Sequence, residues 1–213
     1  MTASLQTAGG PDVPDAPLTP ERRNAIITAC VVGGAGCIGV AVPMVASFAP
    51  SEREKAAGGP VEVDVSSIAA GEMRIVEWQG KPVWVLHRSP AMIASLKNHD
   101  ALLGDPDSKR NSNYPSPDYA LKDPSTRSIK PEFFVAIGIC THLGCSPSGP
   151  FAPNENAQLG DQPGFFCPCH GSTFDMAGRV FKDKPAADNL QVPSYRFKSD
   201  SMIVIGEDQK KSA

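Results

Sequence analysis

The sequence predicts an all-β domain of antiparallel strands, preceded by one N-terminal transmembrane helix. Three observations support this fold class. Among 213 residues are 21 prolines and 19 glycines but only 7% aromatics, which favours short strands and frequent turns. The run Val61–Val65 alternates apolar and polar side chains with a period of two, as a half-buried strand does. One long uncharged stretch lies near the N-terminus.

Residues 1–21 are rich in Pro, Gly, Thr and Ala without periodicity, and we expect a disordered leader there. Residues 22–50 are predicted to be a transmembrane anchor. Its core, Ala25–Ala49, is apolar or small throughout and is long enough to cross a hydrocarbon layer of about 30 Å. Signal peptides have shorter apolar regions of at most about 15 residues, so we expect the anchor to be retained. Ser47-Phe48-Ala49 resembles a cleavage site and leaves removal as the alternative.

The charges beside the anchor do not decide its orientation, because basic residues precede and follow it. Arg22 and Arg23 together resemble a twin-arginine export signal. Residues 51–59 are charged helix formers ending in two glycines. They are predicted to be a hinge spanning about 14 Å as helix and about 30 Å when extended, with a passive linker as the alternative.

The soluble domain, residues 60–213, is predicted to begin with a strand at Val61–Val65. Met73–Trp78 and Pro82–His87 flank a short turn and predict a hairpin. Ser89 followed by proline predicts the start of a short helix that ends at Lys97.

Residues 98–131 are polar and contain several prolines, which predicts a long surface excursion. Phe133–Ile139 is predicted to be a buried strand, and Tyr195–Phe197 pairs with Met202–Ile205 in a predicted closing hairpin. His87 and His99 have no cysteine nearby in the sequence and are expected to be ordinary surface or strand histidines.

Two short runs hold four of the six cysteines and two of the four histidines. They are Cys140-Thr141-His142-Leu143-Gly144-Cys145 and Cys167-Pro168-Cys169-His170-Gly171-Ser172. Thiolates beside imidazoles suit zinc, copper or an iron–sulfur cluster, whereas calcium and magnesium prefer oxygen ligands. Structural zinc sites usually show paired C-x(2–4)-C knuckles, and here each run offers a cysteine, a histidine and a further cysteine. Spacing alone leaves zinc open. The net charge of −3 shows no excess of basic residues of the kind that binds nucleic acid.

These two runs resemble the Rieske iron–sulfur family, in the form found in the quinol–cytochrome c oxidoreductases, the cytochrome bc complexes. Both family loops, C-T-H-L-G-C and C-P-C-H-G-S, occur here unchanged. The resemblance covers nearly all of the chain outside the leader and residues 98–131. Oxygenase-type Rieske domains and ferredoxins typically lack the two extra cysteines. The resemblance implies an antiparallel Rieske domain with a small cluster-binding subdomain at about residues 138–187.

The resemblance also implies a 2Fe–2S cluster, with cysteines on one iron and histidines on the other. The implied ligands are Cys140, Cys167, His142 and His170. Cys145 and Cys169 are implied to form a disulfide, which needs an oxidising compartment such as the periplasm. Imidazoles in place of thiolates make such a cluster easier to reduce, and each imidazole keeps a second nitrogen that can take a proton.

Further residues are implied to surround the cluster, namely Leu143, Gly144, Ser172, Phe174 and Pro185. Ser172 matches the family serine that hydrogen-bonds a bridging sulfide. Phe174 stands where many relatives have tyrosine, and we expect a lower cluster potential because that hydroxyl is missing. Pro185 lies in residues 182–187, which align with the family's proline loop. That loop usually reads Gly-Pro-Ala-Pro, whereas Lys184 and Ala187 stand at its ends here.

The function implied by the resemblance is that of the electron-transfer subunit of a respiratory cytochrome bc complex. Such a subunit takes one electron from ubiquinol and passes it to a c-type cytochrome by domain movement. His170 would contact the quinol and accept its proton, and His142 is the less favoured contact. The implied partners are a cytochrome b subunit and a c-type cytochrome in a dimeric complex.

The expected location is the inner membrane of a bacterium, with the leader in the cytoplasm and the domain in the periplasm. Two alternatives belong to other classes. One is a soluble Rieske subunit of another periplasmic oxidoreductase, such as an arsenite-oxidase-like enzyme, with its signal cleaved after Ala49. The other is a zinc-stabilised binding module without a redox role.

Overall fold

The computed structural model describes residues 19–49, 58–97, 99–110 and 115–208. The chain divides into two units, Met1–Ser51 and Glu52–Ala213. Most of the predicted leader and most of the predicted hinge lie outside the described residues.

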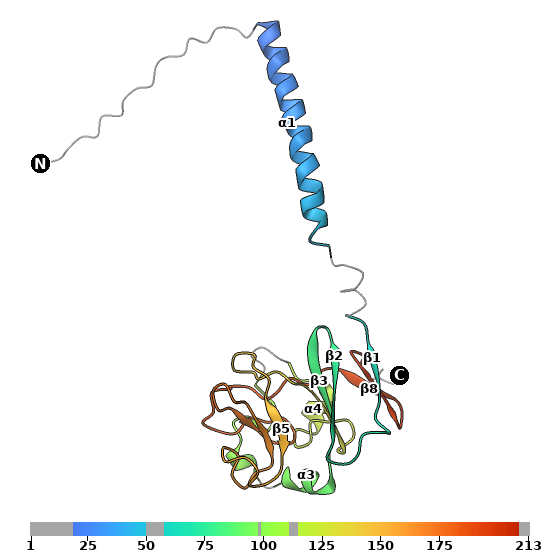
Figure 1. Ribbon diagram of the computed structural model, residues 1–213, viewed down its shortest axis with the longest axis vertical. Coiled ribbons are helices and arrows are strands. Elements are labelled where there is room, and N and C mark those ends of the chain that lie inside the picture. Colours follow the sequence, from blue (N-terminus) through green and yellow to red (C-terminus); the bar gives the residue numbers. More distant parts are fainter. Residues whose placement is uncertain (1–18, 50–57, 98, 111–114, 209–213) are drawn as a thin grey trace, which may run out of the picture. The chain divides into compact units, whose positions relative to one another are not determined.

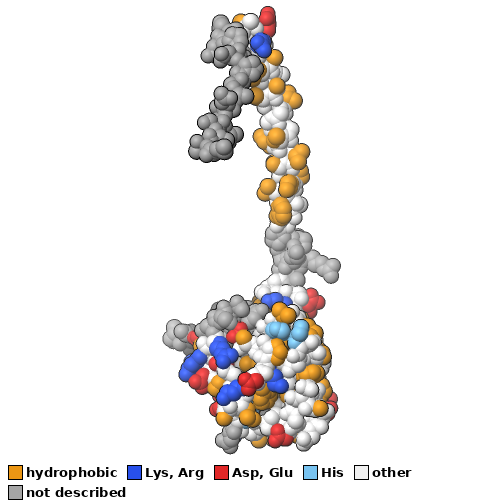
Figure 2. Space-filling model, turned by 90° about the vertical axis from the view of Figure 1, so that its left-hand side faces the viewer, with side chains coloured by type: hydrophobic (Ala, Val, Ile, Leu, Met, Phe, Trp, Pro, Cys, Tyr) orange, Lys and Arg blue, Asp and Glu red, His pale blue; other side chains and the backbone are white. Residues whose placement is uncertain are grey.

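The described part of the first unit is the helix α1, Pro20–Ala46. Thr19 caps its N-terminus by accepting a hydrogen bond from the backbone N–H of Arg22, and proline occupies the first helical position, where its missing N–H is not needed. The helix is long and apolar enough to cross a membrane. Figure 2 shows hydrophobic side chains along its length and charged ones at its N-terminal end. The predicted anchor is therefore a helix, and its bounds differ from residues 22–50 by two to four positions.

Nine strands in the described part of the second unit form three antiparallel sheets (Figure 1). The first sheet has the order β1 (Val61–Asp64), β9 (Met202–Ile205), β8 (Tyr195–Ser199). The second has the order β2 (Met73–Trp78), β3 (Lys81–His87), β4 (Phe133–Ile137). The third has the order β5 (Ser148–Phe151), β6 (Gly164–Phe166), β7 (Thr173–Phe174). The antiparallel β prediction is confirmed.

The second sheet separates two hydrophobic cores, because alternate residues of a strand point to opposite faces. Val83 and Val85 of β3 belong to the core shared with the first sheet. Trp84 and Leu86 belong to the core that also contains the cysteines Cys140 and Cys167. All five residues of β4 are buried, so this strand is covered on both faces. The ligand-bearing part of the domain thus packs directly on the central sheet.

The predicted strands agree with the structure to within one or two residues at most ends. The β2–β3 hairpin turns at Gln79 and Gly80, both with positive φ, as a two-residue hairpin loop requires. The predicted helix after Ser89 is α3, Pro90–Ser95, capped by the Ser89 hydroxyl, and it ends before Lys97. The predicted strand Phe133–Ile139 ends at Ile137.

The prediction of a surface excursion at residues 98–131 is wrong for much of the part that the structure describes. It contains the short helices η1 (Asp100–Leu102) and α4 (Asp118–Lys122). Leu103 and Arg127 are buried, and so is His99, which the sequence placed with the ordinary surface or strand histidines. The two polar residues are internal because each has a buried partner, a carboxylate for His99 and backbone carbonyls for Arg127, and a pattern of apolar residues does not reveal such partners.

Candidate metal centre

The first cysteine–histidine loop follows β4 and is closed by its own backbone. The N–H of Cys140 donates to the carbonyl of Cys145 at 2.7 Å, and the N–H of Gly144 donates to the carbonyl of Cys140 at 3.0 Å. Gly144 has φ +85°, a left-handed conformation that glycine adopts without steric cost. Leu143 is 71% exposed at the tip of this loop.

The second loop joins β6 to β7 and repeats the same bonding. The N–H of Cys167 donates to the carbonyl of Ser172 at 2.8 Å, and the N–H of Gly171 donates to the carbonyl of Cys167 at 3.1 Å. Gly171 has φ +82°. Two loops with the same closure therefore present equivalent cysteines, each buried with 2% of its surface exposed.

A disulfide between Cys145 and Cys169 joins the two loops, with their Cα atoms 6.6 Å apart. The sulfur atoms of Cys145, Cys167 and Cys169 lie within 4.8 Å of one another. Because two of these sulfurs are used in the disulfide, the three do not form a metal site by themselves. Among them only Cys167 keeps a free thiol, and Cys140 is the other buried free cysteine nearby.

The two loop histidines lie together, with their ring centroids 4.7 Å apart and their planes at 86°. His170 is exposed and His142 is half-buried. The Nδ1 atom of His142 is buried and has no hydrogen-bond partner among the described residues. An unpaired buried ring nitrogen is unfavourable unless something else occupies its lone pair, and a metal ion does so.

The buried thiols give the same indication. Burial raises the pKa of the Cys140 thiol; a hydrogen bond to the backbone of His142 opposes this, and the nearby Cys167 raises the pKa further. A buried thiol such as that of Cys140 disfavours its thiolate form unless a cation is bound, and a bound metal deprotonates a coordinating thiol. Two thiols and two imidazoles, one with an orphaned nitrogen, therefore fit a metal group of mixed sulfur and nitrogen ligation.

Comparisons with known proteins identify the family. The pattern described as "Rieske [2Fe-2S] domain" matches residues 120–196. The chain is 51% identical over 193 residues to a ubiquinol-cytochrome c reductase iron-sulfur subunit of Allochromatium vinosum, covering 89% of each chain. The chain belongs to the Rieske iron–sulfur subunit family. A Bradyrhizobium diazoefficiens subunit of the same name is 39% identical over 191 residues, covering 88% of this chain and 95% of the relative.

The cofactor of this Rieske domain is a [2Fe–2S] cluster. Membership of the family confirms the predicted fold and cofactor, and it removes the alternative of a zinc-stabilised module. The assignment of individual ligands remains a prediction, which the clustering of the two loops supports.

Residues 182–187, here named the strap, contact the second ligand loop of the Rieske domain, and the residue directly after the strap contacts the first. The N–H of Ala186 donates to Oγ of Ser172 at 3.0 Å, which leaves the hydroxyl proton of this buried serine available to the site. Immediately after the strap, the carbonyl of Asp188 accepts from Oγ1 of Thr141 at 2.6 Å. Pro185, directly before these two contacts, is exposed.

Phe174 ends the short strand β7 and is fully buried. It pairs across the third sheet with Phe165 of β6 and belongs to the same core as the two free cysteines. Its ring supplies no hydrogen-bond donor.

Sequence reasoning missed two buried arginines that bind the turn behind the second ligand loop. Arg88 donates to the carbonyl of Met176 at 3.3 Å, and Arg127 donates to the carbonyls of Ala177 at 3.0 Å and Leu190 at 2.9 Å. Burial lowers the pKa of both guanidinium groups to about 10, so both stay charged at neutral pH. They hold the chain between the second loop and the residues after the strap.

Sequence reasoning also missed a buried ion pair at the same turn. Asp175 accepts from Nε of Arg179 at 2.7 Å, and it contacts Nε2 of His99 at 3.1 Å. Nη1 of Arg179 donates to Asp100 at 3.0 Å, and Nη2 donates to the carbonyl of Leu96 at 3.1 Å. The spacing of four residues between Asp175 and Arg179, directly after the second loop, was the only signal in the sequence. The ion pair connects the ligand-bearing subdomain to Leu96, His99 and Asp100.

Proposed function

We propose that this chain is the membrane-anchored electron-transfer subunit of a bacterial quinol–cytochrome c reductase. One observation carries the proposal. Two equivalent loops, joined by a disulfide, bring together two buried thiols and two imidazoles. The relatives named ubiquinol-cytochrome c reductase iron-sulfur subunit match the chain over nearly nine-tenths of its length.

In this proposal Cys140 and Cys167 hold one iron of the cluster, and His142 and His170 hold the other. When bound, the cluster supplies a one-electron acceptor whose potential is raised by its two imidazole ligands. The orphaned Nδ1 of His142 is the nitrogen that would face the metal, which leaves Nε2 directed away from it. We assign the same arrangement to His170.

The exposure of His170 supports its role as the contact with ubiquinol. A quinol hydroxyl would donate a hydrogen bond to Nε2 of His170, and the imidazole would take the proton as the electron leaves. His142 is less exposed and is the secondary candidate. The neighbouring Leu143 is apolar and exposed, so it offers contact area to the protein surface that binds the quinol.

The proposed partners are the cytochrome b subunit, where the quinol binds, and a c-type cytochrome that receives the electron, in a dimeric complex. The disulfide supports placing the domain in the oxidising periplasm, with α1 crossing the inner membrane and residues 1–21 in the cytoplasm. Movement about residues 51–59 would carry the domain between its two partners.

The proposal is tested on the full-length chain purified in detergent after anaerobic loading. We expect two irons and two acid-labile sulfides per chain and an EPR signal in the reduced state. Zinc in place of iron, or a reduced sample without an EPR signal, would contradict the proposal. A mature N-terminus after Ala49 would contradict the anchor and favour the soluble alternative.

Domain movement has its own test, made in the assembled complex. Replacing Ala56 and Ala57 by proline should stiffen the hinge and block electron delivery to the c-type cytochrome, with the EPR spectrum unchanged. Turnover at the wild-type rate would argue against movement.

A further inference from the structure

The strap contains one proline, Pro185, and its stiffness must therefore come mainly from contacts with other parts of the domain. Its contacts with the ligand loops involve Ala186 and, just after it, Asp188. The structure shows a second set of contacts on the strap, made by residues 99–110, here named the brace. The brace belongs to the segment that the sequence predicted to be a surface excursion.

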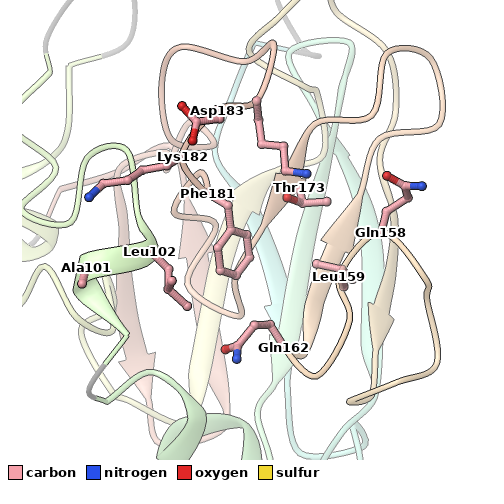
Figure 3. Close-up of a pocket in the computed structure, with 10 residues that line it drawn as sticks. Ala101, Leu102, Gln158, Leu159, Gln162, Thr173, Phe181, Lys182 and Asp183 are labelled. Carbon is pink, nitrogen blue, oxygen red and sulfur yellow. The ribbon is translucent and has the colours of Figure 1, made fainter.

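The brace first pairs with the start of the strap as a strand does. The N–H of Lys182 donates to the carbonyl of Leu102 at 2.8 Å, and the N–H of Gly104 donates to the carbonyl of Val180 at 2.8 Å. Leu103 and Phe181 form the antiparallel bridge between them. Figure 3 shows Leu102 of the brace near Phe181, where both line one pocket of about 330 Å³.

The brace also reaches the end of the strap. Nη1 of Arg110 donates to the carbonyl of Ala187, the last strap residue, at 2.7 Å. Two residues later, the buried Asn189 donates to the carbonyl of Asp105 at 2.9 Å and to Oγ of Ser108 at 3.1 Å. Both ends of the strap are thus bonded to one continuous segment.

The turn that presents Arg110 is fixed by a buried carboxylate. Asp105 is 6% exposed, and its two oxygens accept from the backbone N–H groups of Lys109 and Arg110, each at 3.0 Å. Ser108 within the turn has φ +53°, a conformation that a non-glycine residue adopts at some cost. The Arg110 side chain itself is exposed at the surface, so the turn, rather than burial, determines its direction.

We propose that Arg110 is a positioning residue, which acts through the strap to hold it across the two ligand loops. This rests on the proposed function, because the strap matters to electron transfer only if the loops hold the cluster. Arg110 restrains Ala187, Ala187 follows the Ala186 amide that bonds Ser172, and Ser172 lies within the second ligand loop. Loss of the Arg110 bond frees the end of the strap and loosens the Ser172 contact.

The test uses the full-length, cluster-loaded chain in detergent with three variants. Arg110→Ala removes the bond to Ala187. Arg110→Lys keeps a charged donor that can reach the same carbonyl. Lys109→Ala is the matched control, since Lys109 is the neighbouring exposed cation and its side chain pairs with Asp107 instead.

Two measurements are made on each variant, namely hydrogen exchange at the Ala186 amide and the EPR spectrum of the reduced cluster. In Arg110→Ala we expect exchange at Ala186 to become roughly fivefold faster, as for the loss of one hydrogen bond, and the g-values to shift. Arg110→Lys should restore both, and Lys109→Ala should match the wild type.

The proposal is overturned if Arg110→Ala exchanges at the wild-type rate, or if Lys109→Ala accelerates exchange equally. The same holds if exchange accelerates while the EPR spectrum stays unchanged, because the strap would then have no influence on the cluster. Failure of the proposed function is a separate result, recognised by the lack of an EPR signal in the wild type itself.

Discussion

Replacing Asp175 by asparagine tests the buried ion pair behind the second ligand loop. The side chain of Asp175 is 1% exposed and accepts from Nε of Arg179, and from the backbone N–H groups of Ala177 at 2.9 Å and Arg179 at 2.7 Å. The asparagine side chain has a similar shape but no charge, so Arg179 loses its buried carboxylate partner, and the carboxylate that remains to it, that of Asp100, is 65% exposed. Removing one member of a buried pair costs about 3–5 kcal/mol of unfolding free energy.

This loss is large enough to measure by calorimetry of the full-length chain. For a domain of about 150 residues, each kcal/mol lowers the melting temperature by about 2–4 °C, so Asp175→Asn should lower it by about 6–20 °C. The matched control is Asp200→Asn, because Asp200 is a fully exposed carboxylate paired with Lys130. We expect the control to have the same melting temperature as the wild type.

The difference in stability between the wild type and Asp175→Asn should also decrease as the pH is lowered. Burial by itself raises the pKa of Asp175, but the His99 hydrogen bond and the charge of Arg179 outweigh it and leave the pKa below its usual value. A lowered pKa stabilises the fold above the unfolded-state pKa of about 3.9 and loses this contribution as the pH falls through the lower folded pKa. The gap between wild type and Asp175→Asn should therefore narrow below about pH 4. An equal gap at pH 7 and pH 3, or a melting temperature like that of the control, would refute the reasoning.

Three further predictions concern single positions. Phe174→Tyr should raise the cluster midpoint potential by at most about 60–130 mV, the equivalent of one charge-assisted hydrogen bond of about 1.5–3 kcal/mol; a redox titration with an unchanged or lowered midpoint contradicts it. Cys145→Ser should reduce the unfolding free energy by about 3 kcal/mol, because it breaks a disulfide between residues 24 apart in sequence. The measurement is a denaturant titration, with Cys30→Ser, which removes a free cysteine, as the control. Equal unfolding free energies for the two variants would contradict the prediction. Gly138→Ala should cost about 1–3 kcal/mol, since the new Cβ would overlap the buried indole of Trp84, and an unaltered melting curve would show that the strand can shift.

The strands and the ligand loops could be predicted because each has a signal in the residues themselves. Alternation along Val61–Val65 reflects one buried face, because Val63 and Val65 are buried while Glu62 and Asp64 are exposed. The two motifs placed four cysteines and two histidines together, and the structure brings all six into the paired loops. Even Phe174 could be singled out, because it is the second residue after the second motif.

The burial of Arg127 had no such signal, because its side chain binds backbone carbonyls. Every residue has a carbonyl, so the partner of a buried arginine leaves no trace in the sequence. Arg127 is fully enclosed among the carbonyls of Ala177, Gly178 and Leu190, yet its neighbours Ser125, Thr126 and Ser128 read as a polar loop. Hydrophobic periodicity reveals only apolar faces, so a polar segment with a buried arginine is predicted to lie at the surface.

Hydrogen bonds from arginine side chains to backbone carbonyls are also the means by which a polar segment supports the metal centre. A backbone carbonyl is an acceptor whose position follows the chain, so an arginine that binds carbonyls restrains the course of the chain itself. Arg127 does this where the turn after the second ligand loop meets the residues following the strap, and Arg110 does it at the end of the strap. Because an exposed donor can be exchanged without opening a buried cavity, Arg110 is the position where strap rigidity can be changed separately from domain stability. The different expected outcomes for Asp175→Asn and Arg110→Ala, a lower melting temperature in one and faster local exchange in the other, follow from that difference in burial.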